Sequence, residues 1–99
     1  MHLYIGGKYQ GMLELAMKEH QVNENQILVI DAATADLAKV EACLDDYAIV
    51  VAQEVGCGVI SMDSQVRKQR EEMGKVLCKL TERADQVTRV MCGLGMKLK

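Results

Sequence analysis

The residues nearest the N-terminus that bear on chemistry are glycines with the spacing of a phosphate-binding loop. In the stretch "GGKYQGML", Gly6 and Gly11 are separated by four residues, as in the pattern G-x-x-x-x-G-K-[ST]. Such a loop holds phosphate through backbone N–H groups and the positive end of the following helix. Gly6, Gly7 and Gly11 retain the backbone part of this design. The Lys and hydroxyl positions hold Met12 and Leu13, so the sequence predicts a degenerate phosphate loop.

Three charged residues are candidates to complete such a site. Lys8 lies inside the loop and is a candidate substitute for the missing lysine, although a solvent-facing lysine is the plainer interpretation. Asp31 closes an apolar segment, where a carboxylate can bind Mg²⁺ beside a nucleotide or simply cap a helix. Glu54 follows a second apolar segment and begins a turn that contains Gly56 and Gly58. Asp31 and Glu54 are therefore the catalytic candidates, and Asp31 is also the Mg²⁺ candidate.

The elements that must position these residues alternate along the chain. Strands are expected at 2–5, 27–31, 47–53 and 86–92, and helices at 12–20, 34–45 and 62–84. This alternation predicts one α/β domain spanning residues 1–99, with a mostly parallel sheet of four to five strands and about three helices. In such sheets ligands lie beyond the carboxyl ends of the strands. The glycine loops and Asp31 are therefore expected to gather at one edge of the molecule.

Local patterns refine this expectation. The segments 27–31 and 47–53 are apolar throughout, which predicts strands buried on both faces. Thr34 is expected to cap the helix that follows it. His20 is expected at a helix end, where its charge suits the helix dipole, and His2 is expected to be exposed at the start of a strand. Gly93 and Gly95 allow a bend into the C-terminal "MKLK".

Composition excludes several classes of function. The net charge is −2 and the basic residues are interspersed with acidic ones, so no nucleic-acid surface is expected. No apolar run reaches the length of a bilayer span and no signal peptide is evident, which predicts a cytoplasmic protein without a membrane partner. The four cysteines form no C-x-x-C pair. They are therefore expected to be reduced thiols that act as small hydrophobes, not zinc ligands.

Short motifs are distributed along the chain, in the order Ile5–Leu13, Asp31–Thr34, Glu54–Val59, Gly74–Lys75, Ala84–Val87 and Gly93–Lys99. Together they resemble one enzyme family, the bifunctional adenosylcobinamide kinases and adenosylcobinamide-phosphate guanylyltransferases of cobalamin biosynthesis. The resemblance implies a P-loop NTPase-like (RecA-like) fold. It also implies ATP or GTP with Mg²⁺ as cofactors, and a nucleotide or a corrinoid as ligand.

Departures from the family pattern bear on activity. Besides Met12 and Leu13, Gln53 stands where the family has Asn. The connection 21–26 is much shorter than the family segment that contains the guanylylated His, and nothing around His20 matches that motif. The first hypothesis is therefore a shortened, non-catalytic member with weak nucleotide or corrinoid binding. An active kinase that uses Lys8 and Asp31 is the second hypothesis, and an oligomeric interaction module is the third.

The sheet itself predicts a homo-oligomer. Three helices at this length are not expected to cover both faces and both edges of a sheet with such apolar strands. Burial of the remaining apolar surface against a second copy, as a dimer or trimer, is the simplest compensation.

Overall fold

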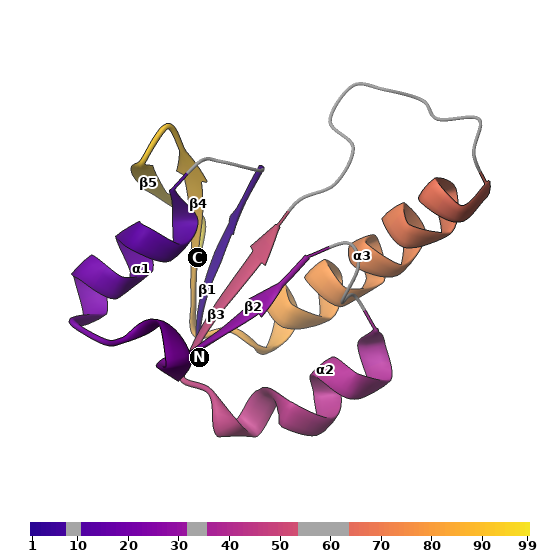
Figure 1. Cartoon of the computed structure of the whole chain (residues 1–99), viewed down its shortest axis with the longest axis horizontal. Helices are drawn as coiled ribbons and strands as arrows, with labels where there is room; N and C mark the ends of the chain where they lie inside the picture. The colour runs from indigo at the N-terminus through magenta and orange to yellow at the C-terminus, as the bar shows by residue number, and fades with distance from the viewer. Residues whose placement is uncertain (8–10, 32–35, 54–63) are drawn as a thin grey trace.

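Five strands form one sheet in a computed structural model, which describes residues 1–7, 11–31, 36–53 and 64–99 (Figure 1). The strands are β1 (His2–Gly6), β2 (Ile27–Ile30), β3 (Ile49–Gln53), β4 (Gln86–Met91) and β5 (Leu94–Lys97). Their order across the sheet is β2-β3-β1-β4-β5, with the first four parallel and β5 antiparallel to β4. The predicted mostly parallel sheet is confirmed, and its architecture is consistent with a P-loop NTPase-like fold.

Three α-helices of the described residues cover the two faces of this sheet. They are α1 (Met12–His20), α2 (Leu37–Cys43) and α3 (Ser64–Arg83), and short 3₁₀ turns occupy Glu24–Gln26 and Leu44–Asp46. Figure 1 shows α1 on one side of the sheet and α2 and α3 on the other. The crossovers between parallel strands require this layered arrangement, because each helix must return the chain to the same end of the sheet.

The alternation of side chains along the strands divides the core between the two faces. Leu3 of β1 and Val50 of β3 pack with Met73 and Leu80 of α3 on one face. Tyr4 and Val51, one position further along each strand, pack with α1 on the other face. Both β1 and β3 therefore lie between two apolar layers, as a parallel sheet with helices on both faces requires.

Strand β2 is less buried than its apolar sequence predicts. It pairs with β3 alone and forms one edge of the sheet, and the side chain of Val29 is 47% exposed on the face that carries α1. The prediction that this strand is buried on both faces is therefore wrong. The cause is tertiary, because α1 lies over the middle of the sheet and leaves the carboxyl end of β2 uncovered. The same prediction is confirmed for β3.

The C-terminal segment forms a hairpin where the sequence suggested only a bend. Cys92 (φ 51°) and Gly93 (φ 76°) both adopt left-handed backbone conformations between β4 and β5. Two such residues in a row make the tight turn whose twist suits an antiparallel pair. The pairing continues beyond β5, since the Leu98 N–H donates to the Val87 carbonyl at 2.8 Å.

The helix ends agree with the sequence in part. Asp36 caps α2 by accepting from the N–H groups of Ala38 (3.1 Å) and Lys39 (3.3 Å). The predicted cap, Thr34, lies outside the described residues. His20 is the last residue of α1, as expected. No helix of the described part of the chain is long and apolar enough to cross a membrane.

The described cysteines differ in their exposure. Cys78 and Cys92 are exposed and Cys43 is partly buried, all three with free thiols, while Cys57 lies outside the described residues. Cys78 points away from the sheet because the inner stripe of α3 passes through Met73, Val76 and Leu80. Cys92 is exposed because it forms the hairpin turn.

Candidate functional site

A hollow of about 450 Å³ opens where the start of α1 meets the carboxyl ends of β2 and β3. Its walls come from three elements, and the lining residues are Gly11, Met12, Leu13, Glu14, Val29, Ile30, Asp31, Val51 and Gln53. The floor is the part of the sheet that α1 leaves uncovered, where Val29 pairs with Val51. Gly11 and Asp31 therefore meet at one edge of the sheet, as the topology predicted.

The backbone at the start of α1 has the form expected after a glycine loop. Gly11 adopts φ 82° and ψ 26°, a left-handed conformation that glycine accepts without strain. Its carbonyl accepts the first helical hydrogen bond, from the Leu15 N–H at 3.0 Å. The N–H groups of the first turn carry the positive end of the helix dipole toward the hollow.

Met12 occupies the lysine position of the phosphate-loop pattern, and its side chain belongs to the core. It is 8% exposed and packs in the cluster that contains Tyr4, Ala16 and Val51. Leu13 is partly buried against the same cluster. The two side chains that would carry charge and hydroxyl chemistry in such a loop instead hold α1 to the sheet.

Packing explains why position 6 is a glycine. It is the last residue of β1, it is buried, and it is not among the lining residues of the hollow. A Cβ placed on Gly6 would lie 2.7 Å from the Val90 carbonyl oxygen and 3.1 Å from the Met12 sulfur. Only glycine fits there, because real Cβ atoms essentially never approach backbone so closely. Gly7 follows at the strand end and is partly buried.

The polar groups that line the described part of the hollow are acidic or neutral. Asp31 is partly buried at the end of β2, and Glu14 is exposed in the first turn of α1. Gln53, at the end of β3, supplies an amide. No lysine, arginine or histidine is among the described lining residues. The described walls thus combine an apolar floor, a helix N-terminus and two carboxylates.

The other predicted site residues are not placed. Lys8, Glu54, Gly56 and Gly58 lie outside the described residues, and their assignment to the site stays a prediction. Among the described residues, no group of three or more His, Cys, Asp or Glu side chains is arranged to hold a metal ion. Asp31 lines the hollow but belongs to no such group.

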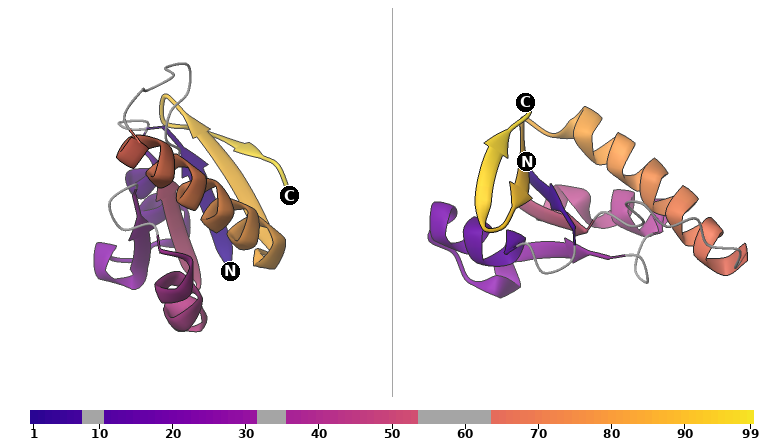
Figure 2. Two further views of the ribbon diagram at one scale, coloured as in Figure 1. Left: turned by 90° about the vertical axis from the view of Figure 1, so that its right-hand side faces the viewer. Right: turned by 90° about the horizontal axis from the view of Figure 1, so that it is seen from above.

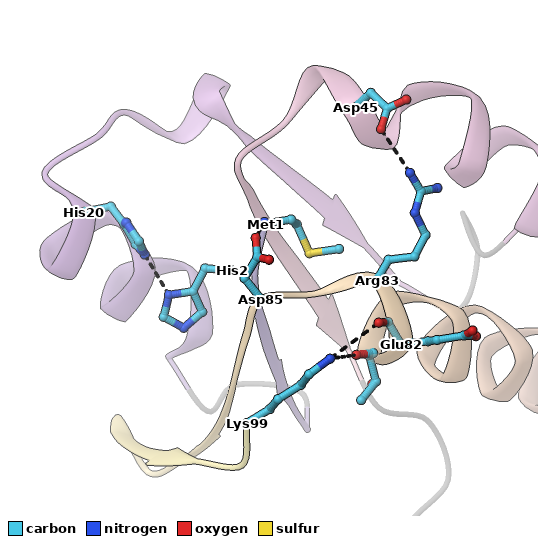
Figure 3. Close-up of polar contacts among 9 residues, drawn as sticks. Met1, His2, His20, Asp45, Glu82, Arg83, Asp85 and Lys99 are labelled. Carbon is cyan, nitrogen blue, oxygen red and sulfur yellow. Dashed lines mark hydrogen bonds and ion pairs between the residues drawn. The ribbon is translucent and has the colours of Figure 1, made fainter.

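A second polar cluster lies at the opposite end of the same face, and reasoning from the sequence missed it. His2 Nε2 and Thr88 Oγ1 are joined by a hydrogen bond of 2.7 Å. Figure 3 shows the contact of His2 with His20, in which His2 Nδ1 lies 3.0 Å from His20 Nε2. The Tyr4 hydroxyl donates to Glu19 Oε1 at 2.6 Å. The His2 ring stacks on Tyr4 with centroids 4.2 Å apart. The i, i+2 spacing of His2 and Tyr4 was the available signal, since it places both rings on one face of a strand.

Burial explains the electrostatics of this cluster. Desolvation and the neighbouring His20 hold the pKa of His2 below its ordinary value, against an opposing effect of Glu19. Desolvation and the hydrogen bond to Glu19 raise the pKa of the Tyr4 hydroxyl. The expectation that His2 is exposed is wrong, because the C-terminal end of α1 packs over the start of β1. The cluster fastens α1 to the sheet and faces away from the hollow.

The comparison with family profiles decides the relationship. The profile described as CobU, cobinamide kinase / cobinamide phosphate guanyltransferase, matches residues 10–98. The chain belongs to this family. The match begins just before α1, so β1 and the Gly6–Gly7 step precede the matched range. The comparison with curated proteins gives no match.

Membership relates the chain to the kinase and guanyltransferase of cobalamin biosynthesis, whose substrates include ATP or GTP. The hollow at the start of α1 lies where such a nucleotide phosphate is expected in a P-loop fold. It has the volume of a small-molecule site, which is typically about 300–1,000 Å³.

Proposed function

We propose that this chain is a non-catalytic member of the cobinamide kinase/guanyltransferase family that keeps a ligand-sized hollow and has lost phosphoryl transfer. The observation that carries the proposal is the position of Met12. Its side chain is packed in the core at the place where the pattern requires a lysine, and Leu13 offers no oxygen to a Mg²⁺ ion. Phosphoryl transfer depends almost wholly on positioned positive charge, so these two replacements remove its main source of stabilisation.

The charges around the hollow support the same conclusion. Asp31 and Glu14 line it, and among the described lining residues a triphosphate would approach two carboxylates with only the helix N-terminus to attract it. A nucleotide is therefore expected to bind weakly. A ligand without negative charge that carries amide groups and apolar surface, such as a corrinoid, suits the floor of Val29 and Val51 better.

Mg²⁺ provides the first test. The ion is usually held by one or two carboxylates together with substrate phosphates, and Asp31 is the candidate ligand that the sequence suggested. Calorimetry with ATP, GTP and GDP is expected to give weak affinities that are nearly independent of Mg²⁺. A strong requirement for Mg²⁺, or turnover of adenosylcobinamide with ATP or GTP, would support the second hypothesis, in which Lys8 and Asp31 perform the chemistry.

A charge variant makes this test sharper. Asp31→Asn removes one negative charge from the wall of the hollow and is expected to strengthen nucleotide binding by roughly threefold to tenfold. In an active enzyme the same change would remove a metal ligand and weaken Mg²⁺-dependent binding. Glu41→Gln on the exposed surface of α2 is the matched control, and it should leave binding unchanged.

A further inference from the structure

The last three residues of α1 contribute no apolar side chain to the core. Lys18, Glu19 and His20 are all exposed, and the buried side chains of the helix lie earlier in it. Two polar contacts attach this end to β1, one from His20 to His2 and one from Glu19 to Tyr4. Figure 2 shows α1 on the opposite side of the sheet from α3, so α3 gives it no support. A segment with so few buried apolar contacts opens locally at low cost in free energy.

His2 connects this helix end to the strands beneath it. Its backbone N–H donates to the Ala48 carbonyl at 2.8 Å, and its Nε2 bonds Thr88 Oγ1 in β4 at 2.7 Å. Its Nδ1 lies 3.0 Å from His20 Nε2 (Figure 3). A contact of this length between two imidazole nitrogens is a hydrogen bond only if one nitrogen, and not both, carries a proton.

The number of protons on the two rings therefore decides whether the bond exists. With both rings neutral, one nitrogen of the contact donates and the other accepts. One extra proton, on the outer nitrogen of His20, leaves the contact intact and makes it a charge-assisted bond. With a second extra proton all four ring nitrogens carry hydrogen, so two N–H groups face each other across 3.0 Å. Two positive rings with centroids 5.0 Å apart then repel one another.

We propose that the pair of His2 and His20 is a proton-operated latch for the end of α1. The latch holds this end on the sheet while the pair carries no extra proton or one, and it releases residues 18–22 when both rings are charged. Met12 and Ala16 keep the earlier part of α1 in place, because both are buried against the sheet. The latch operates irrespective of the ligand or activity of the hollow, which lies at the other end of the helix.

The surroundings of His2 set the direction of the response to pH. Desolvation and the neighbouring His20 hold the pKa of His2 below its ordinary value of 6.5; Glu19 opposes this effect and the Met1 amine adds to it. The Met1 amine is itself paired with Asp85 at 2.6 Å. The released state therefore binds more protons than the latched state, and release is favoured as the pH falls below about 6.5.

The other titratable groups around the pair come from α1, β1, β5 and the tail that follows β5. Tyr4 stacks beneath His2 and donates to Glu19. Lys97 and Lys99 border the same depression as Glu19 and Thr88. Histidine is the side chain whose ordinary pKa lies between about pH 5 and pH 8. Mild acid in that range therefore acts on the latch through its two imidazole rings.

Nitrogen–proton NMR spectra of the two rings test the latch in the wild-type chain. Between about pH 8 and pH 4.5 the pair is expected to titrate in two coupled steps, the second about one to two pH units below the first. Independent titration of both rings in a single step near about pH 6.5 is the behaviour of separate exposed histidines, and it would overturn the proposal.

Hydrogen exchange locates the opening. The amides of Gln21 and Val22 both donate to the Met17 carbonyl at the end of α1. Their protection, relative to an unstructured peptide at the same pH, is expected to fall about tenfold between about pH 7 and pH 5. The amides of α2 should keep their protection over this range. An equal loss in α2 would indicate unfolding of the whole chain, and this result or an unchanged α1 would contradict the latch.

Two variants assign the effect to the pair. His20→Gln replaces a titrating ring by an amide that can still bond His2, so the protection of Gln21 and Val22 should no longer depend on pH. Lys18→Gln removes a positive charge from the same exposed turn and is the matched control, which should retain the tenfold fall. If His20→Gln disturbs α1 at neutral pH, the ring titration of the wild-type chain still decides. A fall that persists in His20→Gln, or that Lys18→Gln abolishes, would refute the assignment.

Discussion

Replacing Met12 by lysine tests whether this position belongs to the core or to a phosphate site. Met12 is 8% exposed and packs with Tyr4, Ala16 and Val51 beneath α1. It also borders the hollow, so a lysine stem could leave the core only by turning its ammonium group into that space. Met12→Lys therefore exchanges core packing for a positive charge at the helix N-terminus.

The expected cost follows from the burial. Full burial of a methionine contributes about 1.5–3 kcal/mol, and a lysine stem that reaches the hollow recovers a fraction of it. Loss of packing around the remaining space adds to the cost, so we expect the free energy of unfolding to fall by about 2–3 kcal/mol. For a chain of this size that is roughly 10–20 °C in melting temperature. Urea unfolding followed by circular dichroism, with thermal melts, measures both quantities.

A second variant at the same position is the control for Met12→Lys. Met12→Leu keeps the volume and should cost less than about 1.5 kcal/mol. If Met12→Lys were as stable as the wild type and also bound nucleotide at least about a hundredfold more tightly, the side chain at this position would face the site. That result would refute the assignment of Met12 to the core and restore a working phosphate loop.

Two further predictions concern the glycines and the histidine pair. Gly6→Ala should lower the free energy of unfolding by about 1–3 kcal/mol in urea titrations, because its Cβ would meet a backbone carbonyl at 2.7 Å. Gly74→Ala, inside α3 with nothing within 4 Å, should instead raise it by about 0.5–1 kcal/mol, and equal effects would contradict the packing argument. Because burial and His20 lower the pKa of His2 from 6.5, the folded state binds fewer protons than the unfolded state, and stability should decline as the pH falls from about 7 to about 5. Urea titrations at several pH values across that range should show that His2→Gln removes this dependence of the free energy of unfolding on pH. An unchanged dependence in the variant would mean that other groups cause it.

Much of the architecture was determined by the sequence. The apolar segment 47–53, the strand-like segment 86–92 and the 3.6-residue periodicity of the helices between strands predicted a mostly parallel α/β sheet. Parallel strands end at a common edge, so the meeting of Gly11 with Asp31 also followed from local patterns. The family relationship rested on short motifs distributed along the chain, and the match over residues 10–98 confirmed it.

Only the tertiary structure decided which apolar positions are covered. Ile27–Ile30 and Ile49–Gln53 look alike in sequence, but the order of strands places one at an edge and the other at the centre. The second half of the hairpin likewise depends on the left-handed turn at Cys92 and Gly93, which the sequence left as a bend.

Met12, in the degenerate phosphate-loop pattern, shows the same division between what the sequence and what the tertiary structure determine. The sequence established that Met12 replaces a lysine, but not whether its side chain faces a ligand or the core. That depends on the rotation of α1 against β1 and β3, which is set by contacts between residues distant in the chain, such as Met12 with Val51 and Tyr4 with Glu19. Local patterns fix the type of each element, whereas the packing of elements against one another fixes the direction in which each side chain points.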